Sequence, residues 1–563
     1  MTDIAALVAD NIHIWTGAIQ RKSGAGRGGG KRVSLYGIER LRALILDLAV
    51  CGKLVPQDAG DEPASKYLLT ASQRVNSTSA KTRRKQVLPS PAKNHELPSG
   101  WSPTYLGSIV DIVRGITFPG SEKSKTPEFG RVACLRTSNV QDQIEWDDIL
   151  YIRDKFVSRA DQYVRHNDII ISMANSRELV GKVAIVDSEP ESPTAFGGFL
   201  AAIRAHSVDP RFIMIFLRCP TTKAQLIDDA SQTTNIANIS LSKLNPLPVP
   251  LPPLAEQRRI VAKVDELMAL CDALERESRD AIAAHQALVE VLLATLVNST
   301  GADLARQWAR LESHFDILFT TDASIDALKH TILDLAVRGK LVEQDARDED
   351  AILLLKRIKA WQTQQVVKKN IRIPRKPLRP VAQDETPIDL PQSWSAVRLG
   401  EIIYIQSGDG LTAAQMKLGD VPVFGGNGIN GYHDEQNIFR ETIVIGRVGF
   451  YCGSIHVTPP AAWVTDNAFI TRFDESSIHL EFLRLLLSAT NLKEDENATA
   501  QPVISGSKIY PIIVGLPPLA EQHRIVTKVD ALMALCDQLK SCLADSAQTQ
   551  RHLADAITER VAA

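Results

Sequence analysis

The sequence LPPLAEQRRIVAKVDELMALCDALE, from Leu251 to Glu275, returns almost unchanged as LPPLAEQHRIVTKVDALMALCDQLK, from Leu516 to Lys540. Twenty of the twenty-five positions are identical. A second stretch, LRALILDLAVCGKLVPQDAGDEPA from Leu41, returns as LKHTILDLAVRGKLVEQDARDEDA from Leu328. The chain is therefore a tandem duplication, and its function uses two similar units.

The spacing of the repeats shows that the two units differ inside. The copies of the Leu41 stretch are 287 residues apart, and those of the Leu251 stretch are 265 apart. Between them, LPSGWSPTYLG from Leu97 weakly matches LPQSWSAVRLG from Leu390 at an offset of 293, so the interior of the first unit is 28 residues longer. Two matched frames hold two mismatched inserts, and we expect each insert to contact something different.

The repeated Leu251 stretch predicts a long helix in each unit. Its apolar residues recur at threes and fours, and the first helix is expected to run about 43 residues from Leu254. A long helix with one apolar stripe needs a partner, and the simplest partner is the other copy, packed antiparallel as a spacer. The predicted packing residues are Ile260, Val264, Leu267, Cys271 and Leu274, with their copies Ile525, Val529, Leu532, Cys536 and Leu539.

The inserts contain short strand-like runs bounded by Gly, Pro and Asn, which is typical of mixed domains. The predicted fold is therefore α+β: two globular mixed α/β inserts separated by two long antiparallel, coiled-coil-like helices in a pseudo-two-fold tandem repeat. The expected parts are an N-terminal helix and Gly-rich linker (1–35), a repeated helical region and basic linker (36–96), the first insert (97–250), a central repeated region with the long helix, the second helical copy and a basic linker (251–389), the second insert (390–515) and the C-terminal repeated helix (516–563).

Composition narrows the class of protein only moderately. A net charge of −2 gives no global signature of non-specific nucleic-acid binding. The seven cysteines form no CxxC pair, which favours buried reduced thiols. No stretch approaches the roughly 18 apolar residues of a membrane span. We expect a soluble cytoplasmic protein with no membrane partner.

With these two repeats and two unlike inserts, the chain resembles the specificity (S) subunit of type I restriction-modification enzymes. The resemblance rests on the LPPLAEQxRIVxKVDxLMxLCDxL and ILDLAVxGKLVxQD motifs and covers nearly the whole sequence. It implies that each insert is a target recognition domain reading one half of an asymmetric, split sequence in double-stranded DNA. It also implies that the helical repeats dock two modification (methyltransferase) subunits, and that restriction/translocase subunits join them. S-adenosylmethionine, ATP and Mg²⁺ are then expected in those partners, with no cofactor and no metal in this chain.

The motifs favour a reader of DNA over a catalyst. Adenine methylation in such systems uses Asn or Asp before Pro-Pro and an aromatic residue, and the Pro-Pro pairs here lie only in LPPLA, twice, and TPPAA. The GAGRGGGKR stretch departs from a phosphate-binding loop in spacing and in having Arg32 where Ser or Thr belongs. GGNGING matches GxGxxG without a following helical pattern. The resemblance implies instead a Gly-Asn loop that approaches the DNA backbone, and the alternative is a tight turn between strands.

Candidate DNA contacts follow from donor chemistry. Lys and Arg suit phosphates, Arg suits guanine, and Asn and Gln suit adenine. Lys243 and Lys508 occupy matching positions in the two inserts, so a contact to phosphate, which both half-sites share, fits them better than sequence reading. The alternative is that each is a solvated charge on a loop. Arg447, alone between glycines after a buried-type strand, is the strongest single candidate for base reading. The full set is Arg136, Asn139, Asn175, Arg177, Asn235, Lys243, Asn427, Tyr432, Arg447, Gln501 and Lys508.

Two other classes of function remain open from the residues. The chain could be a structural adaptor whose inserts bind proteins, or a single-chain DNA methyltransferase or nuclease. The missing catalytic Pro-Pro loop counts against the enzyme. Sequence-specific binding to duplex DNA would separate the reader from the adaptor.

Overall fold

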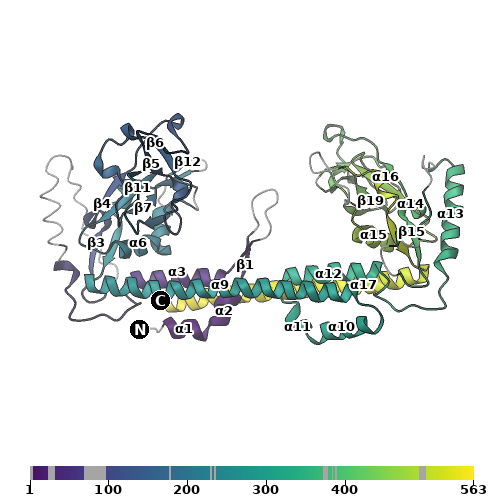
Figure 1. Ribbon diagram of the computed structural model, residues 1–563, viewed down its shortest axis with the longest axis horizontal. Coiled ribbons are helices and arrows are strands. Elements are labelled where there is room, and N and C mark those ends of the chain that lie inside the picture. The colour runs from purple at the N-terminus through teal and green to yellow at the C-terminus, as the bar shows by residue number, and fades with distance from the viewer. Residues whose placement is uncertain are drawn as a thin grey trace. The chain divides into compact units, whose positions relative to one another are not determined.

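The computed structural model describes residues 4–22, 32–66, 68, 97–176, 179–228, 231–233, 236–371, 378–382, 385–386, 390–449, 451–492 and 503–562. They form two compact units (Figure 1). Unit 1 holds residues 1–280 and 546–563, and unit 2 holds residues 281–545. The long helices α9 (Leu254–Asn298) and α17 (Leu519–Ala562) each begin in one unit and end in the other. Each unit therefore contains one insert, the start of one long helix and the end of the other.

The helices of unit 1 begin with a broken N-terminal segment. The sequence predicted a single helix there, but the structure has two, α1 (Ile4–Asp10) and α2 (Ile12–Gly17). They are separated at Asn11, whose side-chain amide donates to the carbonyl of Leu7 at 2.9 Å. Strands β1 (Gln20–Lys22) and β2 (Arg32–Ser34) follow as an antiparallel pair, and the Gly-rich stretch between them lies outside the described residues. Helix α3 (Tyr36–Val50) is the first copy of the repeated short helix, and it buries one apolar face.

The first insert domain, residues 97–250, is built from small sheets. Its four-stranded antiparallel sheet has the order β4-β11-β7-β9, and its three-stranded sheet has the order β10-β5-β6 with β10 parallel to β5. The strands of these two sheets are β4 (Val110–Arg114), β11 (Leu200–Ala205), β7 (Ile169–Ser172), β9 (Val183–Ile185), β10 (Thr194–Phe196), β5 (Arg131–Leu135) and β6 (Leu150–Arg153). The other elements are β3 (Ser102–Tyr105) paired with β14 (Pro248–Leu251), β12 (Ser231–Thr233), β13 (Ile236–Asn238) and β8 (Ala174–Asn175) in a third sheet, and helices α5 (Leu106–Ile109), α6 (Pro210–Arg218), α7 (Pro220–Asp228) and α8 (Leu241–Leu244).

The second insert domain, residues 390–515, repeats the topology of the four-stranded sheet, the three-stranded sheet with a parallel pair and the two-stranded pair, although the two sequences differ; its described residues have no counterpart of the β12-β13-β8 sheet. Its sheets have the orders β16-β22-β19-β20 and β18-β17-β21, again with one parallel pair, β17 and β21. Its elements are β15 (Ser395–Arg398) paired with β23 (Ile513–Leu516), β16 (Tyr404–Ser407), β22 (Ala468–Arg472), β19 (Thr442–Gly446), β20 (Ile455–Thr458), β18 (Gly428–His433), β17 (Val421–Gly425), β21 (Trp463–Val464), α14 (Leu399–Ile402), α15 (Leu480–Ala489) and α16 (Gly506–Ile509). The inserts are thus unlike in sequence and length but alike in architecture.

The remaining helices of unit 2 precede its insert. They are α10 (Gly301–Ser313), α11 (Phe315–Leu318), α12 (Asp322–Val337) and α13 (Ala351–Val367). Helix α12 is the second copy of the repeated short helix, and Thr321 caps it by accepting from the N–H of Ser324 at 3.0 Å. The ammonium of Lys340 donates to the carbonyls of Val297 at 2.7 Å and Ser299 at 2.9 Å, which ties the end of α9 to the loop after α12.

Both copies of the repeated blocks are fastened to their own long helix by the same ion pair. Arg259 of α9 contacts Asp61 at 2.6 Å, and Arg524 of α17 contacts Asp348 at 2.6 Å. Both carboxylates are almost wholly buried, so each needs its arginine. The repeated QD…D segment therefore anchors the start of each long helix.

The apolar stripe of each long helix packs within its own unit. On α9 the five predicted packing residues are buried, and on α17 Leu532 and Leu539 are half-buried while the other three are buried. Arg42 of α3 reaches Asp272 and Glu275 of α9 at 2.6 and 3.0 Å, and in unit 2 α12 and α17 are joined by two ion pairs, Lys329 with Asp537 and Asp326 with Lys540. The expected pairing of the two long helices with each other is not confirmed.

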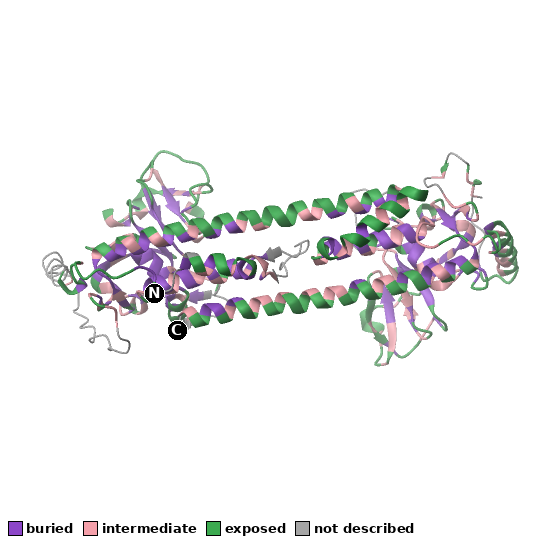
Figure 2. Ribbon diagram, turned by 90° about the horizontal axis from the view of Figure 1, so that it is seen from below, coloured by how far each residue is buried: buried purple, intermediate pink, exposed green. Residues whose placement is uncertain are grey.

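The apolar pattern continues toward the far end of each helix, where Leu296 of α9 and Ile557 of α17 are buried. By contrast, Leu288 of α9 is 53% exposed and Leu553 of α17 is 46% exposed. Figure 2 shows buried, intermediate and exposed stretches alternating along the long helices. Helix α9 contains an 18-residue window with a mean hydropathy of 1.5, long and apolar enough to cross a membrane by length and composition alone. The expectation that no stretch approaches this limit is corrected. A single such helix is weak evidence for a span, because Val289, Leu293 and Leu296 of α9 belong to the core of unit 2.

All seven cysteines are free. Five are buried, as expected, but Cys51 and Cys542 are exposed. Burial raises the pKa of the Cys134 thiol to about 12 and that of Cys271 to about 11. These two side chains therefore remain neutral thiols that pack in the core.

Candidate nucleic-acid interface

The turn between β10 and β11 in the first insert domain is held by the same backbone hydrogen bonds as the turn between β21 and β22 in the second. The N–H of Met173 donates to the carbonyl of Phe199 at 2.8 Å, and the N–H of Arg447 donates to the carbonyl of Asn467 at 2.9 Å. These bonds identify Met173 with Arg447, and Phe199 with Asn467, as corresponding positions. The sequence repeats do not reveal this correspondence, because the offset has fallen to 274 and 268 residues here.

A glycine is required beneath this turn in both domains. The N–H of Gly115 donates to the carbonyl of Leu200 at 3.0 Å, and that of Gly408 donates to the carbonyl of Ala468 at 3.2 Å. A Cβ added to Gly115 would lie 2.2 Å from the carbonyl oxygen of Gly197, and one added to Gly408 would lie 2.2 Å from that of Val464. Close approach of two backbones therefore explains why both domains have glycine at this position, at the same offset of 293 residues.

The residue after β7, and its counterpart after β19, is fixed on its other side as well. The N–H of Ile239 donates to the carbonyl of Met173 at 2.8 Å, and the N–H of Ile504 donates to the carbonyl of Arg447 at 2.9 Å. The strand end, the turn and the closing segment of each domain thus meet at one place. We call these places tip cluster 1 (residues 136–139, 172–176, 179–181 and 197–199) and tip cluster 2 (residues 426–428, 446–449, 451–454 and 465–467).

The side chains carried by this common backbone are different. In tip cluster 1, Phe199 is 66% exposed and Met173 is buried. In tip cluster 2, Asn467 is exposed, and the guanidinium of Arg447 lies 5.3 Å from the ring centre of Phe469. One cluster presents an apolar side chain where the other presents an amide. A surface with constant geometry and variable chemistry can read different partners in the same orientation.

The sequence suggested that Arg447 projects freely into solvent, but the structure shows that it does not. Its Nη1 lies 3.3 Å from both the hydroxyl of Ser407 and the carbonyl of Asp466, and its side chain is half-buried over Phe469. The cation–π contact and these weak bonds fold it back onto its own domain. Arg447 therefore supports tip cluster 2 and reaches outward only in part.

Two candidates of the first insert domain are engaged in local structure. Arg136 is ion-paired with Asp148 at 2.6 Å. Asn139 is buried, its Oδ1 accepts from the N–H of Arg136 at 2.9 Å, and its Nδ2 donates to the carbonyl of Glu145 at 2.9 Å. Asn139 is therefore corrected from a base-reading candidate to a residue that closes its own loop, because both ends of its amide are used.

Other candidates lie on or near the tip clusters. Asn175 of β8 is half-buried, and its Oδ1 accepts from the N–H of Ser176 at 2.9 Å. Asn427 is exposed in the tight turn between β17 and β18, where Gly428 has a φ of +89°. The GGNGING stretch is thus a strand–turn–strand, and Tyr432 is exposed on β18 beyond it. Three candidates, Arg177, Asn235 and Gln501, lie outside the described residues.

The two shared lysines occupy equivalent short helices. Lys243 lies on α8 and is half-buried, while Lys508 lies on α16 and is exposed. At the start of each helix the hydroxyl of the N-cap serine contacts that of a serine in the helix, Ser240 with Ser242 at 2.7 Å and Ser505 with Ser507 at 2.8 Å. The structure therefore repeats this local geometry in both domains, which suits a contact to something both domains share.

Residues that sequence reasoning missed include Phe199, Asn467 and Tyr451, all exposed in the tip clusters. An aromatic residue in a sequence is as compatible with a core as with a surface. The correspondence of Phe199 with Asn467 becomes visible only when the backbone hydrogen bonds of the two domains are compared.

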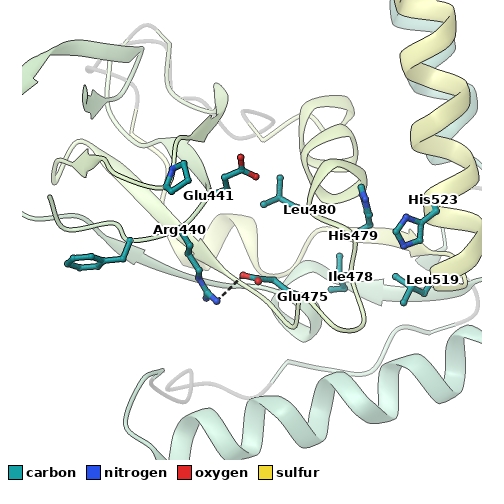
Figure 3. Close-up of a pocket in the computed structure, with 10 residues that line it drawn as sticks. Arg440, Glu441, Glu475, Ile478, His479, Leu480, Leu519 and His523 are labelled. Carbon is teal, nitrogen blue, oxygen red and sulfur yellow. Dashed lines mark ion pairs between the residues drawn. The ribbon is translucent and has the colours of Figure 1, made fainter. Parts of the chain in front are cut away.

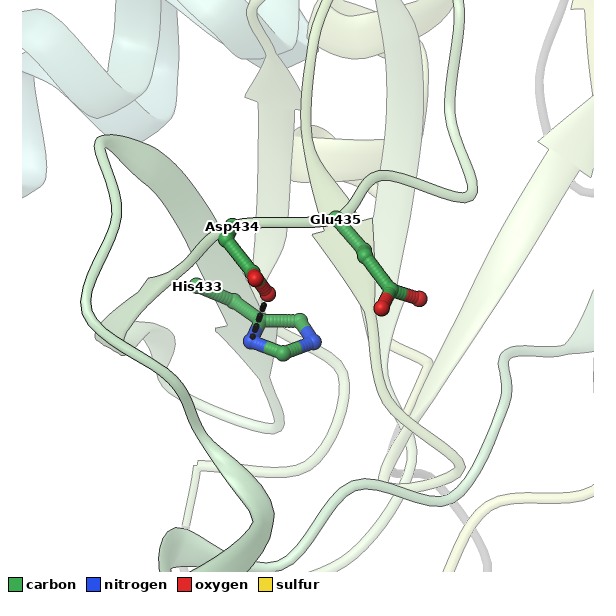
Figure 4. Close-up of side chains that lie close together, drawn as sticks. All are labelled: His433, Asp434 and Glu435. Atoms are coloured by element: carbon green, nitrogen blue, oxygen red, sulfur yellow. Dashed lines mark ion pairs between the residues drawn. The ribbon is translucent and has the colours of Figure 1, made fainter.

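Among the residues that the structure describes, one group of side chains is close enough together to hold a metal ion. Ligand atoms of His433, Asp434 and Glu435 lie within 4.8 Å of one another (Figure 4). Lys417 already supplies a cation there, with its ammonium 2.9 Å from Glu435 and 3.7 Å from Asp434, and its N–H donates to Nδ1 of His433 at 3.1 Å. This arrangement satisfies the charges internally and gives no support for a metal.

A cavity of about 490 Å³ lies between the second insert domain and the start of α17 (Figure 3). The rings of His479 and His523 meet edge to face with centres 4.4 Å apart, and Arg440 pairs with Glu475 at 3.0 Å. Burial, and then the neighbouring His523, lower the pKa of His479. The ring contact and the ion pair make this a packing contact between the domain and the helix.

Comparison with known proteins agrees with two repeated domains on a helical frame. A family model described as "Type I restriction modification DNA specificity domain" matches residues 98–284 and 391–545. The chain belongs to this family.

Two relatives match over nearly the whole length of the chain. The chain is 32% identical to the type I restriction enzyme EcoEI specificity subunit and 33% identical to that of EcoAI, both from Escherichia coli, with 99% of each chain covered. Among solved structures, the HsdS subunit from Thermoanaerobacter tengcongensis is 20% identical, with a TM-score of 0.40 over 83% of this chain and 98% of that one.

Proposed function

We propose that this chain supplies DNA sequence recognition to a type I restriction-modification complex, and that its two insert domains each read one half of an asymmetric, bipartite target in double-stranded DNA. The observation that carries this proposal is the pair of tip clusters, which have one backbone framework and unlike exposed side chains. Such an arrangement suits two readings of one kind of molecule in one orientation. The matching family and the two full-length relatives support it.

The same proposal assigns the chain a scaffolding role without catalysis. Two modification subunits would dock on the repeated frames, one on each, because the frames are nearly identical. Restriction/translocase subunits would join them, and S-adenosylmethionine, ATP and Mg²⁺ would be bound by those partners in the cytoplasm. The long helices α9 and α17 would act as an antiparallel spacer that fixes the gap between the half-sites.

Non-specific affinity would come from groups that the two domains share. Lys243 and Lys508, on equivalent short helices, suit contacts to phosphates. Because they are common to both domains, they would set the docking of each domain without choosing a sequence. Base choice would rest on the tip clusters.

The proposal is tested by expressing the chain with its modification subunit and mapping methylated adenines across the host genome by single-molecule sequencing. We expect a split motif with a fixed gap. Replacing residues 97–250 with the corresponding domain of a relative should change only one half of the motif. A stable complex that neither methylates nor prefers any duplex sequence would contradict DNA reading and favour a protein-binding adaptor.

A further inference from the structure

At one pair of corresponding positions, Phe199 and Asn467, both tip clusters expose a side chain and the two side chains differ in chemistry. The carbonyl of each accepts a hydrogen bond from the N–H of the residue that follows β7 in the first domain or β19 in the second. The alternatives are weaker: the group around His433 is neutralised by Lys417, and the cavity beside His479 is a packing contact.

We infer that Phe199 and Asn467 are corresponding specificity-determining residues, each contacting a base of the half-site read by its own domain. This inference rests on the proposed function and names residues for it. Phe199 reads by apolar contact, and Asn467 reads by hydrogen bonds.

The backbone of the turn is rigid enough to position a reading side chain. The N–H of Gly197 donates to the carbonyl of Leu135 at 2.9 Å, and the N–H of Thr465 donates to the carbonyl of Phe424 at 2.9 Å. The turn is thus bonded to a sheet strand on one side and to Met173 or Arg447 on the other. A side chain on a fixed backbone loses little further entropy when it meets a base, which favours selective contacts.

The chemistry at each position indicates the kind of base contact. An exposed phenyl ring has no polar group to offer, so Phe199 suits the methyl group of thymine or a wedge between base steps. The amide of Asn467 offers a donor and an acceptor, the pattern that matches adenine in the major groove. The first half-site should therefore contain a base pair that Phe199 contacts through apolar atoms alone. The second half-site should contain a base pair to which the amide of Asn467 makes hydrogen bonds.

The experiment uses the full chain in complex with its modification subunit. The wild-type complex first defines the motif by mapping methylated adenines. The affinities of wild-type, Phe199→Ala, Phe199→Leu and Asn467→Ala complexes are then measured for the target duplex and for duplexes with single base-pair changes in each half. Phe129→Ala is the matched control, because Phe129 is another exposed phenylalanine (108%) of the first insert domain. It precedes β5, whereas the turn that carries Phe199 is bonded to the last residue of that strand.

We expect Phe199→Ala to reduce discrimination by about tenfold at one base pair of the first half-site and to leave the second half-site unchanged. Asn467→Ala should reduce discrimination at one base pair of the second half-site and leave the first half-site unchanged. Phe129→Ala should match the wild type at every base pair. If Phe199→Ala impairs folding, Phe199→Leu, which keeps an apolar side chain of intermediate size, replaces it as the deciding variant.

Folded variants that retain wild-type discrimination at every base pair would overturn the inference. Equal loss at all base pairs, which a purely structural role would give, would overturn it too. A wild-type complex without any motif would instead contradict the proposed function, so the two failures are distinguishable.

Discussion

The indole nitrogen of Trp101 lies 3.0 Å from a carboxylate oxygen of Glu256, and this buried bond joins the entry of the first insert domain to the first turn of α9. Trp394 makes the same bond to Glu521 at 3.0 Å in unit 2. Both glutamates are fully buried. Each insert domain is therefore fastened to its long helix by a buried polar contact that recurs in both copies.

Removing the donor of this bond should loosen the first insert domain. Trp101→Phe leaves the buried carboxylate of Glu256 without its indole partner, and we expect a loss of about 1–3 kcal/mol in the stability of unit 1. Denaturant unfolding combined with hydrogen exchange of β3 and the start of α9 measures it. Trp394→Phe is the matched control and should affect unit 2 alone, whereas an unchanged unit 1 in Trp101→Phe would contradict the role of the bond.

The two glutamates should also make stability depend on pH. Burial is the main cause that raises the pKa of Glu256 and of Glu521 above their usual value of 4.5, while the indole partners act in the opposite direction. Because folding raises the pKa of both carboxyl groups, the protonated glutamates favour the folded state. Their contribution to the free energy of unfolding is complete below the unfolded pKa and is lost as pH rises through the folded pKa. Glu256→Gln with Glu521→Gln keeps an acceptor for each indole and removes the charge. Its melting temperature should exceed that of the wild type at pH 8 and match it at pH 4; an equal difference at both pH values would exclude titration as the cause.

Gly52, which follows the repeated short helix α3, should resist substitution for two separable reasons, backbone strain and a steric clash. Gly52 has a φ of +70°, and a Cβ there would lie 2.5 Å from Cγ of Pro98. Gly130 has a φ of +75° with no neighbour within 4 Å of an added Cβ. Gly130→Ala should thus cost about 1–2 kcal/mol from backbone strain alone, and Gly52→Ala about 2–5 kcal/mol from strain plus the clash. Chemical denaturation compares the two, and equal costs would show that the proline contact yields easily.

The parts of the fold that could be predicted are those set by local periodicity. Helices α9 and α17 are 45 and 44 residues long, close to the length expected from the spacing of Ile260, Val264 and Leu267. The partner of that stripe could not be predicted, since an apolar stripe specifies burial but not what covers it. The repeated short helices α3 and α12 also carry apolar faces, and they meet the stripes within each unit.

The candidate site was harder to predict because donor chemistry is visible in a sequence and solvent exposure is not. Asn139 has the chemistry of a base reader, but a loop hydrogen bond at each end of its amide consumes it. Phe199 has the chemistry of a core residue, but it is exposed. The equivalence of Phe199 and Asn467 depends on hydrogen bonds between segments distant in sequence, and no repeated motif marks it.

The last residues of the chain should stabilise its first insert domain's unit. The end of α17 belongs to unit 1, where Asp555 accepts from the hydroxyl of Tyr36 at 2.8 Å and pairs with Arg40 at 2.8 Å, and Ile557 is buried in the core. Deleting residues 546–563 uncovers that core and leaves Tyr36 and Arg40 without their carboxylate, so hydrogen exchange should accelerate in α2 and α3 while α12 keeps its protection. Asp555→Asn, which removes only the charge, should produce a smaller effect in the same helices. Equal acceleration in α12 would show that α17 stabilises the chain as a whole and not unit 1 in particular.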